Sequence, residues 1–171
     1  MKNKKRPVLY SCVAHERGPK LPKKVQYMRK MWMDVCEKNP DCVLYDPQQH
    51  TIEEILELYT NSVFCLQPYG DTKTRQAIFD SIAMGCIPIV HWDSLTYYSM
   101  HLPDPRKVAV LVHAPLQNAV LSAVEAARNL TQSERDKLQD ELLKVLPSIT
   151  WSFSPPEFRD ALTVLLEKLY L

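Results

Sequence analysis

The sequence predicts an α/β fold, a Rossmann-like parallel sheet flanked by helices. Short apolar runs alternate with longer amphipathic helical patterns along the chain, which is typical of β-α repeats. The chain has 171 residues, 46% of them hydrophobic, which is enough for one compact core. No repeat, low-complexity segment or long linker divides it. We therefore expect residues 1–171 to form a single domain, with residues 1–5 as a flexible tail.

The first half of the chain supplies three of the expected strands. In chain order, the predicted elements are a strand at 8–13, a Lys-rich helix at 22–38, a strand at 43–45, a helix at 52–59 and a strand at 63–66. The first helix follows a turn that contains Gly18 and Pro19. Thr51 and Glu54 have the spacing of a capping box, which marks where the second helix begins.

The second half repeats the alternation and then ends in helices. Its predicted elements are a helix at 74–84, a strand at 86–90, an irregular stretch at 91–105, a strand at 107–112 and helices at 115–129, 132–146 and 155–171. Gly85 follows the first of these helices as a C-terminal cap. Thr131 and Ser154 are the expected N-caps of the last two helices, because each has a Glu three residues later.

Charge and hydropathy exclude several classes of function. The 21 Lys and Arg residues against 20 Asp and Glu leave a net charge of +1, so we expect no nucleic-acid partner and any anion site must be local. The longest apolar runs are far shorter than the stretch of about 20 residues that spans a bilayer, and the N-terminus lacks a signal-like apolar region. The sequence therefore shows no targeting or transmembrane segment.

The five cysteines do not have the spacing of a metal site. Their odd number and the absence of a C-x-x-C pair argue against zinc, and the histidines also lack partners at ligand spacing. Cys65 and Cys86 lie in apolar runs and are interpreted as small buried residues. Cys36 and Cys42 are able to close a small disulfide loop in an oxidising compartment, although the sequence alone favours free thiols.

The segment Gly70-Asp71-Thr72-Lys73-Thr74 has the residue types of a phosphate-binding loop but not the spacing of a Walker A motif. That motif needs two glycines, one of them directly before its Lys, and that glycine is missing before Lys73. The dinucleotide fingerprint G-x-G-x-x-G is excluded, since the chain has three glycines in all. A kinase-like function is accordingly the remote alternative.

With both nucleotide-binding motifs set aside, this segment is interpreted as a strand, a loop with Gly70 and Asp71, and a helix whose first turn carries Thr74 and Arg75. Unpaired N–H groups, hydroxyls and cations meet there, as an anion such as a diphosphate requires. The plainer alternative is that Asp71 or Thr72 only caps the helix and that the cations are solvated.

Three loops are expected at one crevice, because ligands of such sheets bind beyond the carboxyl ends of the strands. These loops are residues 15–18, 67–71 and 91–94. Asp80 lies within the helix that follows the second loop, and its carboxylate either faces solvent or accepts hydrogen bonds from sugar hydroxyls.

This pattern resembles the exostosin-type glycosyltransferases, glycosyltransferase family 47, and most closely their plant xyloglucan galactosyltransferase-like branch. The resemblance runs from about residue 6 to residue 151. Its central motifs are S-V-F-C-L-Q-P-Y-G-D at 62–71, T-R at 74–75, F-D-S at 79–81 and G-C-I-P-I at 85–89, and supporting matches include Arg6-Pro7 and the spacing of Cys36 and Cys42.

The resemblance implies a fold, a substrate class and a set of site residues. The chain is similar to the C-terminal, nucleotide-sugar-binding half of a two-domain GT-B architecture, whose acceptor-side N-terminal domain is expected on a missing segment or another chain. The implied donor is a UDP-sugar and the implied acceptor a glycan. The expected donor-binding residues are Arg75 at the diphosphate, Asp80 at the ribose, Gln67, Gly70, Asp71 and Thr74 in the loop, and Arg17 as a further phosphate candidate.

The implied reaction is inverting glycosyl transfer without a metal or other cofactor, for use in polysaccharide biosynthesis. The catalytic base is expected from the acceptor-side domain, so none is assigned here, although His15, His91 and Asp93 are crevice residues that can be tested. The family implies a Golgi lumen or membrane location. A non-catalytic nucleotide-sugar-binding module remains the alternative.

Overall fold

A single parallel sheet forms the centre of the protein in the computed structural model, which describes residues 5–16, 22–71, 73–99, 101–102, 104–152 and 159–169. Its strands are β1 (Val8–Val13), β2 (Cys42–Tyr45), β3 (Ser62–Gln67), β4 (Ile87–His91) and β5 (Val110–Val112). They lie in the order β2-β1-β3-β4-β5, and every neighbouring pair is parallel. The predicted Rossmann-like α/β sheet is therefore confirmed.

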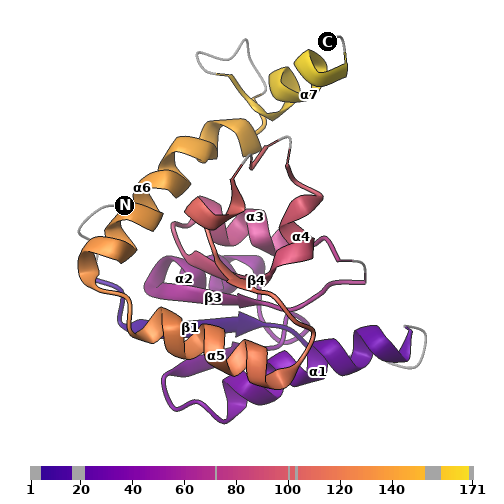
Figure 1. Ribbon diagram of the computed structural model, residues 1–171, viewed down its shortest axis with the longest axis vertical. Coiled ribbons are helices and arrows are strands. Elements are labelled where there is room, and N and C mark those ends of the chain that lie inside the picture. Colours follow the sequence, from indigo (N-terminus) through magenta and orange to yellow (C-terminus); the bar gives the residue numbers. More distant parts are fainter. Residues whose placement is uncertain are drawn as a thin grey trace.

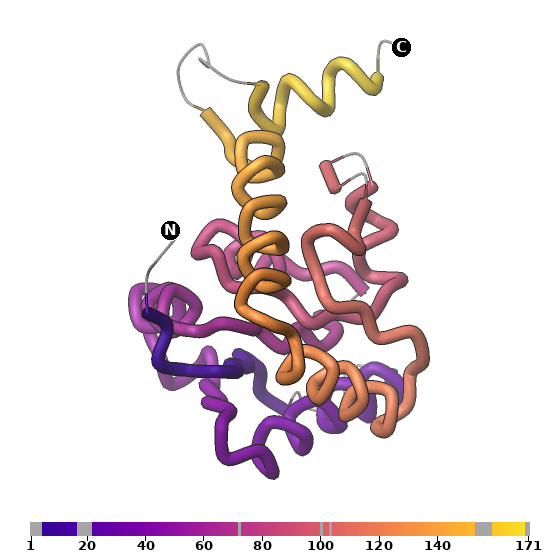
Figure 2. Tube along the Cα trace, turned by 60° about the vertical axis from the view of Figure 1, so that its left-hand side comes forward, coloured from indigo at the N-terminus to yellow at the C-terminus, as the bar shows by residue number. Residues whose placement is uncertain are grey.

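Helices cover the sheet on both sides (Figure 1). They are α1 (Lys23–Glu37), α2 (Ile52–Asn61), α3 (Gln76–Ala83), α4 (Trp92–Thr96), α5 (Gln117–Arg128), α6 (Gln132–Ile149) and α7 (Ala161–Leu169), with a 3₁₀ turn, η1 (Pro105–Lys107). Figure 2 shows α6 running away from the sheet toward α7, the yellow helix at the top. Within the described residues, no helix is both long enough and apolar enough to cross a bilayer.

The apolar side chains of β2 alternate between two clusters, as do those at 64–66 of β3, whereas Ile87, Ile89 and Val90 of β4 all belong to the larger one. The larger cluster joins the sheet to α1, α5 and α6 and contains Trp32, Phe64 and Ile89. The smaller one joins the other side of β1 and β3 to α2 and contains Val13 and Leu58. This two-sided burial is what a parallel sheet requires, since both of its faces must be covered.

Several of the predicted boundaries were wrong, as the last strand and the last two helices show. The last strand is shorter than 107–112, because Pro105 and the N-capping carboxylate of Asp104 set up the η1 turn first. Helix α6 continues past Pro147 to Ile149. Near its end, His101 Nδ1 donates to the Ser148 carbonyl, and the Ser148 hydroxyl donates to the His101 carbonyl. Helix α7 begins at Ala161, whereas the predicted cap Ser154 lies outside the described residues.

Both predictions about the cysteines need correction, because the structure contains two disulfides. Cys36 and Cys42 are joined where α1 ends and β2 begins, with their Cα atoms 5.3 Å apart. Cys65 and Cys86 are buried as expected, but they are also joined, with Cα atoms 5.9 Å apart. The second pair forms because β3 and β4 are neighbours in the sheet, which the sequence alone does not reveal.

Candidate functional site

A cleft of about 510 Å³ lies at the carboxyl ends of β1 and β3. Its walls come from the ends of both strands, from α1 and from the start of α3. The lining residues are Val13, Ala14, His15, Arg29, Pro47, Gly70, Asp71, Thr74, Arg75, Gln76 and Ala77. In a sheet of order 2-1-3-4-5 the chain reverses its direction of winding between β1 and β3, and ligands of such folds bind at this switch point. We therefore take this cleft as the candidate site.

Arg75 ties the two strand ends together. Its Nη2 donates to the Val13 carbonyl at 2.9 Å and its Nη1 donates to the Pro68 carbonyl at 3.1 Å. The residue is extended and precedes α3, so the helix begins at Gln76, two residues later than predicted, and Arg75 is not in its first turn. The extended backbone is held by Tyr98, whose hydroxyl accepts from the Arg75 N–H at 2.8 Å.

The charge of Arg75 is not paired with an acid in the part of the chain that the structure describes. Among the residues that the structure describes, its guanidinium bonds to main-chain carbonyls and to no carboxylate. A guanidinium has five N–H donors, so two bonds leave three for a ligand. A half-buried cation in a cleft with donors to spare is an anion site by charge and by geometry.

Arg29 is a second cation in the cleft, and the sequence analysis missed it. It comes from the buried face of α1 and is 6% exposed. Its Nε and Nη2 both donate to the Tyr69 carbonyl, at 3.1 and 3.0 Å, and Nη2 lies 3.7 Å from a carboxylate oxygen of Asp71. The available signal was its position in an apolar stripe with Met28, Met31 and Trp32, because arginine is seldom buried without a specific partner.

The cleft brings together several of the predicted donor-binding residues. Gly70, Asp71, Thr74 and Arg75 all line it. Gln67 is 1% exposed and is not among the lining residues; its amide donates to the Ala77 carbonyl at 3.2 Å and so fixes the start of α3. The N-cap residue of α3 is Arg75, so the capping alternative for Asp71 is wrong, and Thr72 and Arg17 lie outside the described residues.

Asp80 lies in a neighbouring cleft. This second cleft, of about 390 Å³, is lined by Gln76, Phe79, Asp80, His101, Ile149, Trp151, Ala161 and Leu165. Burial raises the pKa of the Asp80 carboxyl, while a hydrogen bond from Gln76 and the charge of Arg75 act in the opposite direction. Arg75 lines the first cleft and Asp80 the second, and Gln76 lines both. The two clefts are therefore neighbours that share Gln76.

The described parts of the three predicted crevice loops meet at the end of the sheet. Arg75 joins the end of β1 to the loop after β3, and the hydroxyl of Tyr69 in that loop donates to Asp93, which follows β4, at 2.6 Å. His15 lines the first cleft, with its Nδ1 4.0 Å from a carboxylate oxygen of Asp46. In the described part of the chain, no group of three or more His, Cys, Asp or Glu side chains is placed to hold a metal ion.

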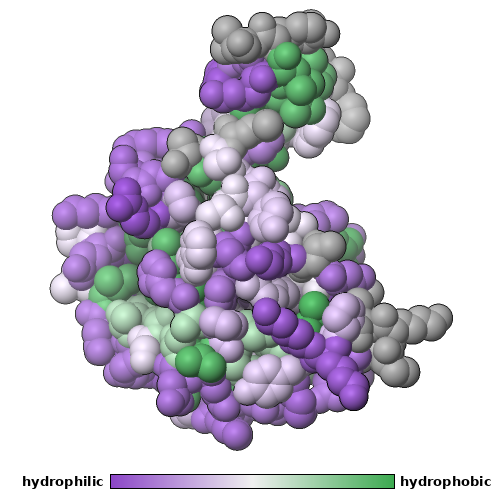
Figure 3. Space-filling model, turned by 45° about the vertical axis from the view of Figure 1, so that its right-hand side comes forward, coloured by the Kyte–Doolittle hydropathy of each residue, from purple (hydrophilic) through white to green (hydrophobic). Residues whose placement is uncertain are grey.

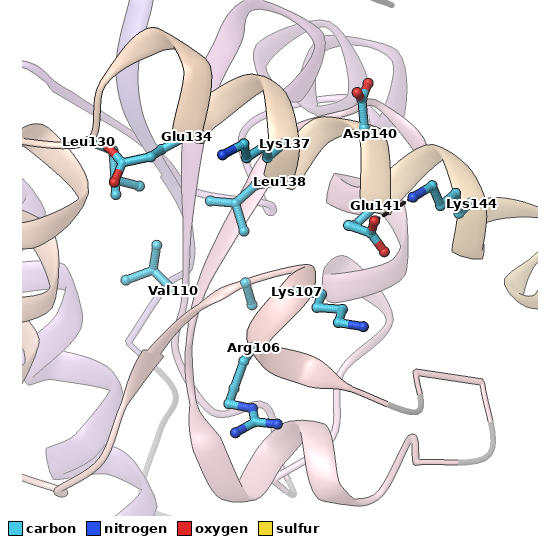
Figure 4. Close-up of a pocket in the computed structure, with 11 residues that line it drawn as sticks. Arg106, Lys107, Val110, Leu130, Glu134, Lys137, Leu138, Asp140, Glu141 and Lys144 are labelled. Atoms are coloured by element: carbon cyan, nitrogen blue, oxygen red, sulfur yellow. Dashed lines mark hydrogen bonds and ion pairs between the residues drawn. The ribbon is translucent and has the colours of Figure 1, made fainter.

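A third groove, of about 610 Å³, runs between α6 and the η1–β5 segment. Figure 4 shows Val110, Leu130 and Leu138 lining it, with charged side chains around them. Four cations and three acids line the groove together, and the pairing of Lys144 with Glu141 shows that they partly compensate each other. Its lining carries the same formal charge as that of the cleft at β1 and β3, so net charge does not separate the two; the cleft differs by its place at the switch point and by Arg75, whose guanidinium bonds to main-chain carbonyls.

The fold and the site define an α/β domain with a cationic cleft at its topological switch point. Comparison with known proteins places this domain in a family: residues 1–127 match the profile of the exostosin GT47 domain. The chain belongs to the exostosin GT47 family, as its motifs indicated.

Its curated relatives include several plant enzymes of Arabidopsis thaliana. The chain is 28% identical over 165 residues to a xyloglucan-specific galacturonosyltransferase, which covers 90% of this chain and 25% of that protein. It is 31% identical over 123 residues to xyloglucan galactosyltransferase XLT2 and, over the same number of residues, to a probable xyloglucan galactosyltransferase. Each of these two matches covers 68% of this chain and 24% of the relative. The chain thus spans about a quarter of the length of these relatives.

Proposed function

We propose that this chain is the donor-binding part of an inverting glycosyltransferase that takes a sugar from a UDP-sugar and transfers it to a glycan. Its similarity to xyloglucan glycosyltransferases supports this class of reaction and a polysaccharide acceptor. The observation that carries the proposal is Arg75, a half-buried cation without a carboxylate partner among the described residues, at the switch point of the sheet. A diphosphate is the part of the donor that suits such a site.

The proposed roles follow the walls of the cleft. Arg75 binds the diphosphate, and Arg29, which lies 3.7 Å from the Asp71 carboxylate, is a second cation in the lining of the cleft. Gly70 and Thr74 offer main-chain N–H groups and a hydroxyl at the same place. Asp80 accepts hydrogen bonds from the ribose in the neighbouring cleft. Gln67 acts indirectly, by fixing the start of α3.

In the proposed reaction, an acceptor hydroxyl oxygen attacks the anomeric carbon while the bond from that carbon to the diphosphate oxygen breaks. The electron pair of the broken bond leaves with UDP, and Arg75 stabilises the charge that grows on the leaving phosphate. The proton of the hydroxyl goes to a general base on the acceptor-side domain, which is proposed to lie on another segment or chain. The cations do the work that a metal ion does in other transferases, so we propose that no metal is required.

Calorimetric titration with nucleotides tests the binding step. We expect UDP to bind and ATP not to compete with it. Selective binding of ATP would instead favour the kinase-like alternative and would remove the basis for a nucleotide-sugar donor.

Release of UDP from UDP-sugars tests whether the chain takes part in catalysis. The assay is run with UDP-galactose and UDP-galacturonic acid, with the chain alone and with a separately produced acceptor-side domain of a relative. Turnover in either arrangement supports the transferase. Binding of UDP without turnover in both arrangements would favour the alternative, a non-catalytic nucleotide-sugar-binding module.

The two disulfides support an oxidising compartment. Cytosolic proteins keep their thiols reduced, whereas disulfides persist along the secretory route. Together with the family, this favours the lumen of the Golgi as the place of action.

A further inference from the structure

Asp93, just after β4, lies at the centre of a cluster of four polar side chains. It accepts hydrogen bonds from the Tyr69 hydroxyl at 2.6 Å and from His91 Nδ1 at 2.7 Å. Its other carboxylate oxygen lies 2.7 Å from the Lys73 ammonium. Two of these partners, Tyr69 and Lys73, belong to the loop that follows β3, whereas His91 ends β4. The cluster therefore connects the loop that lines the anion cleft to the neighbouring strand.

The carboxylate of Asp93 is charged and well enclosed. Its side chain is 19% exposed. Burial acts to raise its pKa, but the hydrogen bonds from Lys73, Tyr69 and His91 outweigh burial and hold the pKa below the ordinary value. The cluster thus joins an ionised carboxylate to a lysine ammonium that is itself 48% exposed and able to move.

Lys73 is the residue that gives the loop its likeness to a phosphate-binding motif, yet it is not among the residues that line the cleft. Its neighbours Asp71, Thr74 and Arg75 do line it. The loop is held from the cleft side by Arg29 and Arg75, which donate to the carbonyls of Tyr69 and Pro68. On the other side it is held by Asp93.

We propose that Lys73 and Asp93 are positioning residues. Their ion pair, here called the latch, fixes the shape of the loop at residues 68–75 before a nucleotide binds. This inference rests on the proposed function. In the latch, Lys73 acts through Asp93 and not on the phosphate. In the opposite assignment, Lys73 binds the phosphate and Asp93 competes for it. That assignment predicts that Asp93→Asn binds UDP more tightly, whereas the latch predicts weaker binding, so titration separates the two assignments.

The ligand-free chain provides the first test. Amide hydrogen exchange is measured by mass spectrometry for Asp93→Asn, with Asp104→Asn as the control, because Asp104 also pairs with a cation, but with Arg106 of the η1 turn and not with a residue of the loop. We expect exchange across residues 68–75 to be about tenfold faster in Asp93→Asn alone, with exchange in α5 and the melting temperature little changed. Unchanged exchange in the loop would overturn the latch, whether or not UDP binds.

Titration with UDP provides the second test. We expect Asp93→Asn and Lys73→Ala each to weaken binding about three- to tenfold and Lys73→Arg, which keeps the ion pair, to restore affinity to within about twofold. Lys144→Ala, which breaks a pair on α6, should leave affinity unchanged. Tighter binding by Asp93→Asn, through release of Lys73, or equal losses in Lys73→Arg and Lys73→Ala, would overturn the proposal.

The dependence of UDP affinity on salt separates the two roles of Lys73 further. A lysine that contacts phosphate contributes to the salt dependence, so its removal should flatten it. Because salt also screens the ion pair of the latch, the latch predicts equal flattening in Lys73→Ala and Asp93→Asn, whereas a lysine that contacts phosphate predicts flattening in Lys73→Ala alone. If the unmodified chain does not bind UDP, the proposed function fails, and the exchange experiment alone then decides whether the latch exists.

Discussion

Replacing Arg75 by alanine should remove most of the affinity for UDP while leaving the chain folded. Two of the five guanidinium donors are used on the Val13 and Pro68 carbonyls, at 2.9 and 3.1 Å, and the remainder are available to the diphosphate. A hydrogen bond to a charged group contributes about 1.5–3 kcal/mol. At about 1.4 kcal/mol for each factor of ten, the dissociation constant should rise roughly ten- to a hundredfold.

The assay is calorimetric titration with UDP, UMP and uridine. The effect of Arg75→Ala should be largest for UDP and should vanish for uridine, because uridine has no phosphate. Arg75→Lys keeps the charge, but a single ammonium does not replace a planar guanidinium that bridges two carbonyls. The UDP affinity of Arg75→Lys should therefore lie between that of the unmodified chain and that of Arg75→Ala. The melting temperature of each variant shows whether the loss comes from binding or from unfolding.

Two results would refute this reasoning. Unchanged UDP affinity in a folded Arg75→Ala chain would show that the cation does not contact the nucleotide. An equal loss of affinity for UDP and for uridine would show that Arg75 acts on the shape of the cleft and not on phosphate.

Three further predictions concern stability. Replacing Cys65 and Cys86 together by alanine should lower the free energy of unfolding by about 3 kcal/mol, measured with urea, since the bond closes a loop of 21 positions; an unchanged midpoint would show that the bond adds nothing. Arg6→Ala should cost about 2 kcal/mol in the same assay, because Arg6 donates to three main-chain carbonyls where α2 and α3 end, and a loss below the error of the assay would contradict this. Burial raises the pKa of Asp80, so its ionisation weakens the fold as the pH rises above about 4. The melting temperature of Asp80→Asn should therefore rise relative to that of the unmodified chain from about pH 4 to 7, while its affinity for UDP falls. A melting-temperature difference that falls with pH would contradict this direction.

Much of the fold could be predicted because its signals are local. Thr51 and Thr131 were identified as helix caps from a residue three positions later, and both capping boxes are complete in the structure. The strands are short apolar runs between turns, and their parallel pairing follows from the helices between them. The meeting of the loops after β1, β3 and β4 then follows from the geometry of a parallel sheet.

The features that were missed depend on contacts between distant segments. The bond between Cys65 and Cys86 requires that β3 and β4 be neighbours, and that order is not written in either strand. Arg29 reaches the cleft only because α1 packs beside the loop after β3. Helix α3 begins late because the Arg75 side chain is held by carbonyls of two strand ends, a tertiary contact that overrides the helical pattern of the sequence.

The position of a bound nucleotide tests the central claim most directly. A crystal structure of the chain soaked with UDP should place the diphosphate within hydrogen-bonding distance of the Arg75 guanidinium and of the loop at Gly70 to Thr74. The nucleotide bound instead in the groove between α6 and β5, or at no ordered position at saturating UDP, would contradict the assignment of the cleft at the ends of β1 and β3 as the donor site.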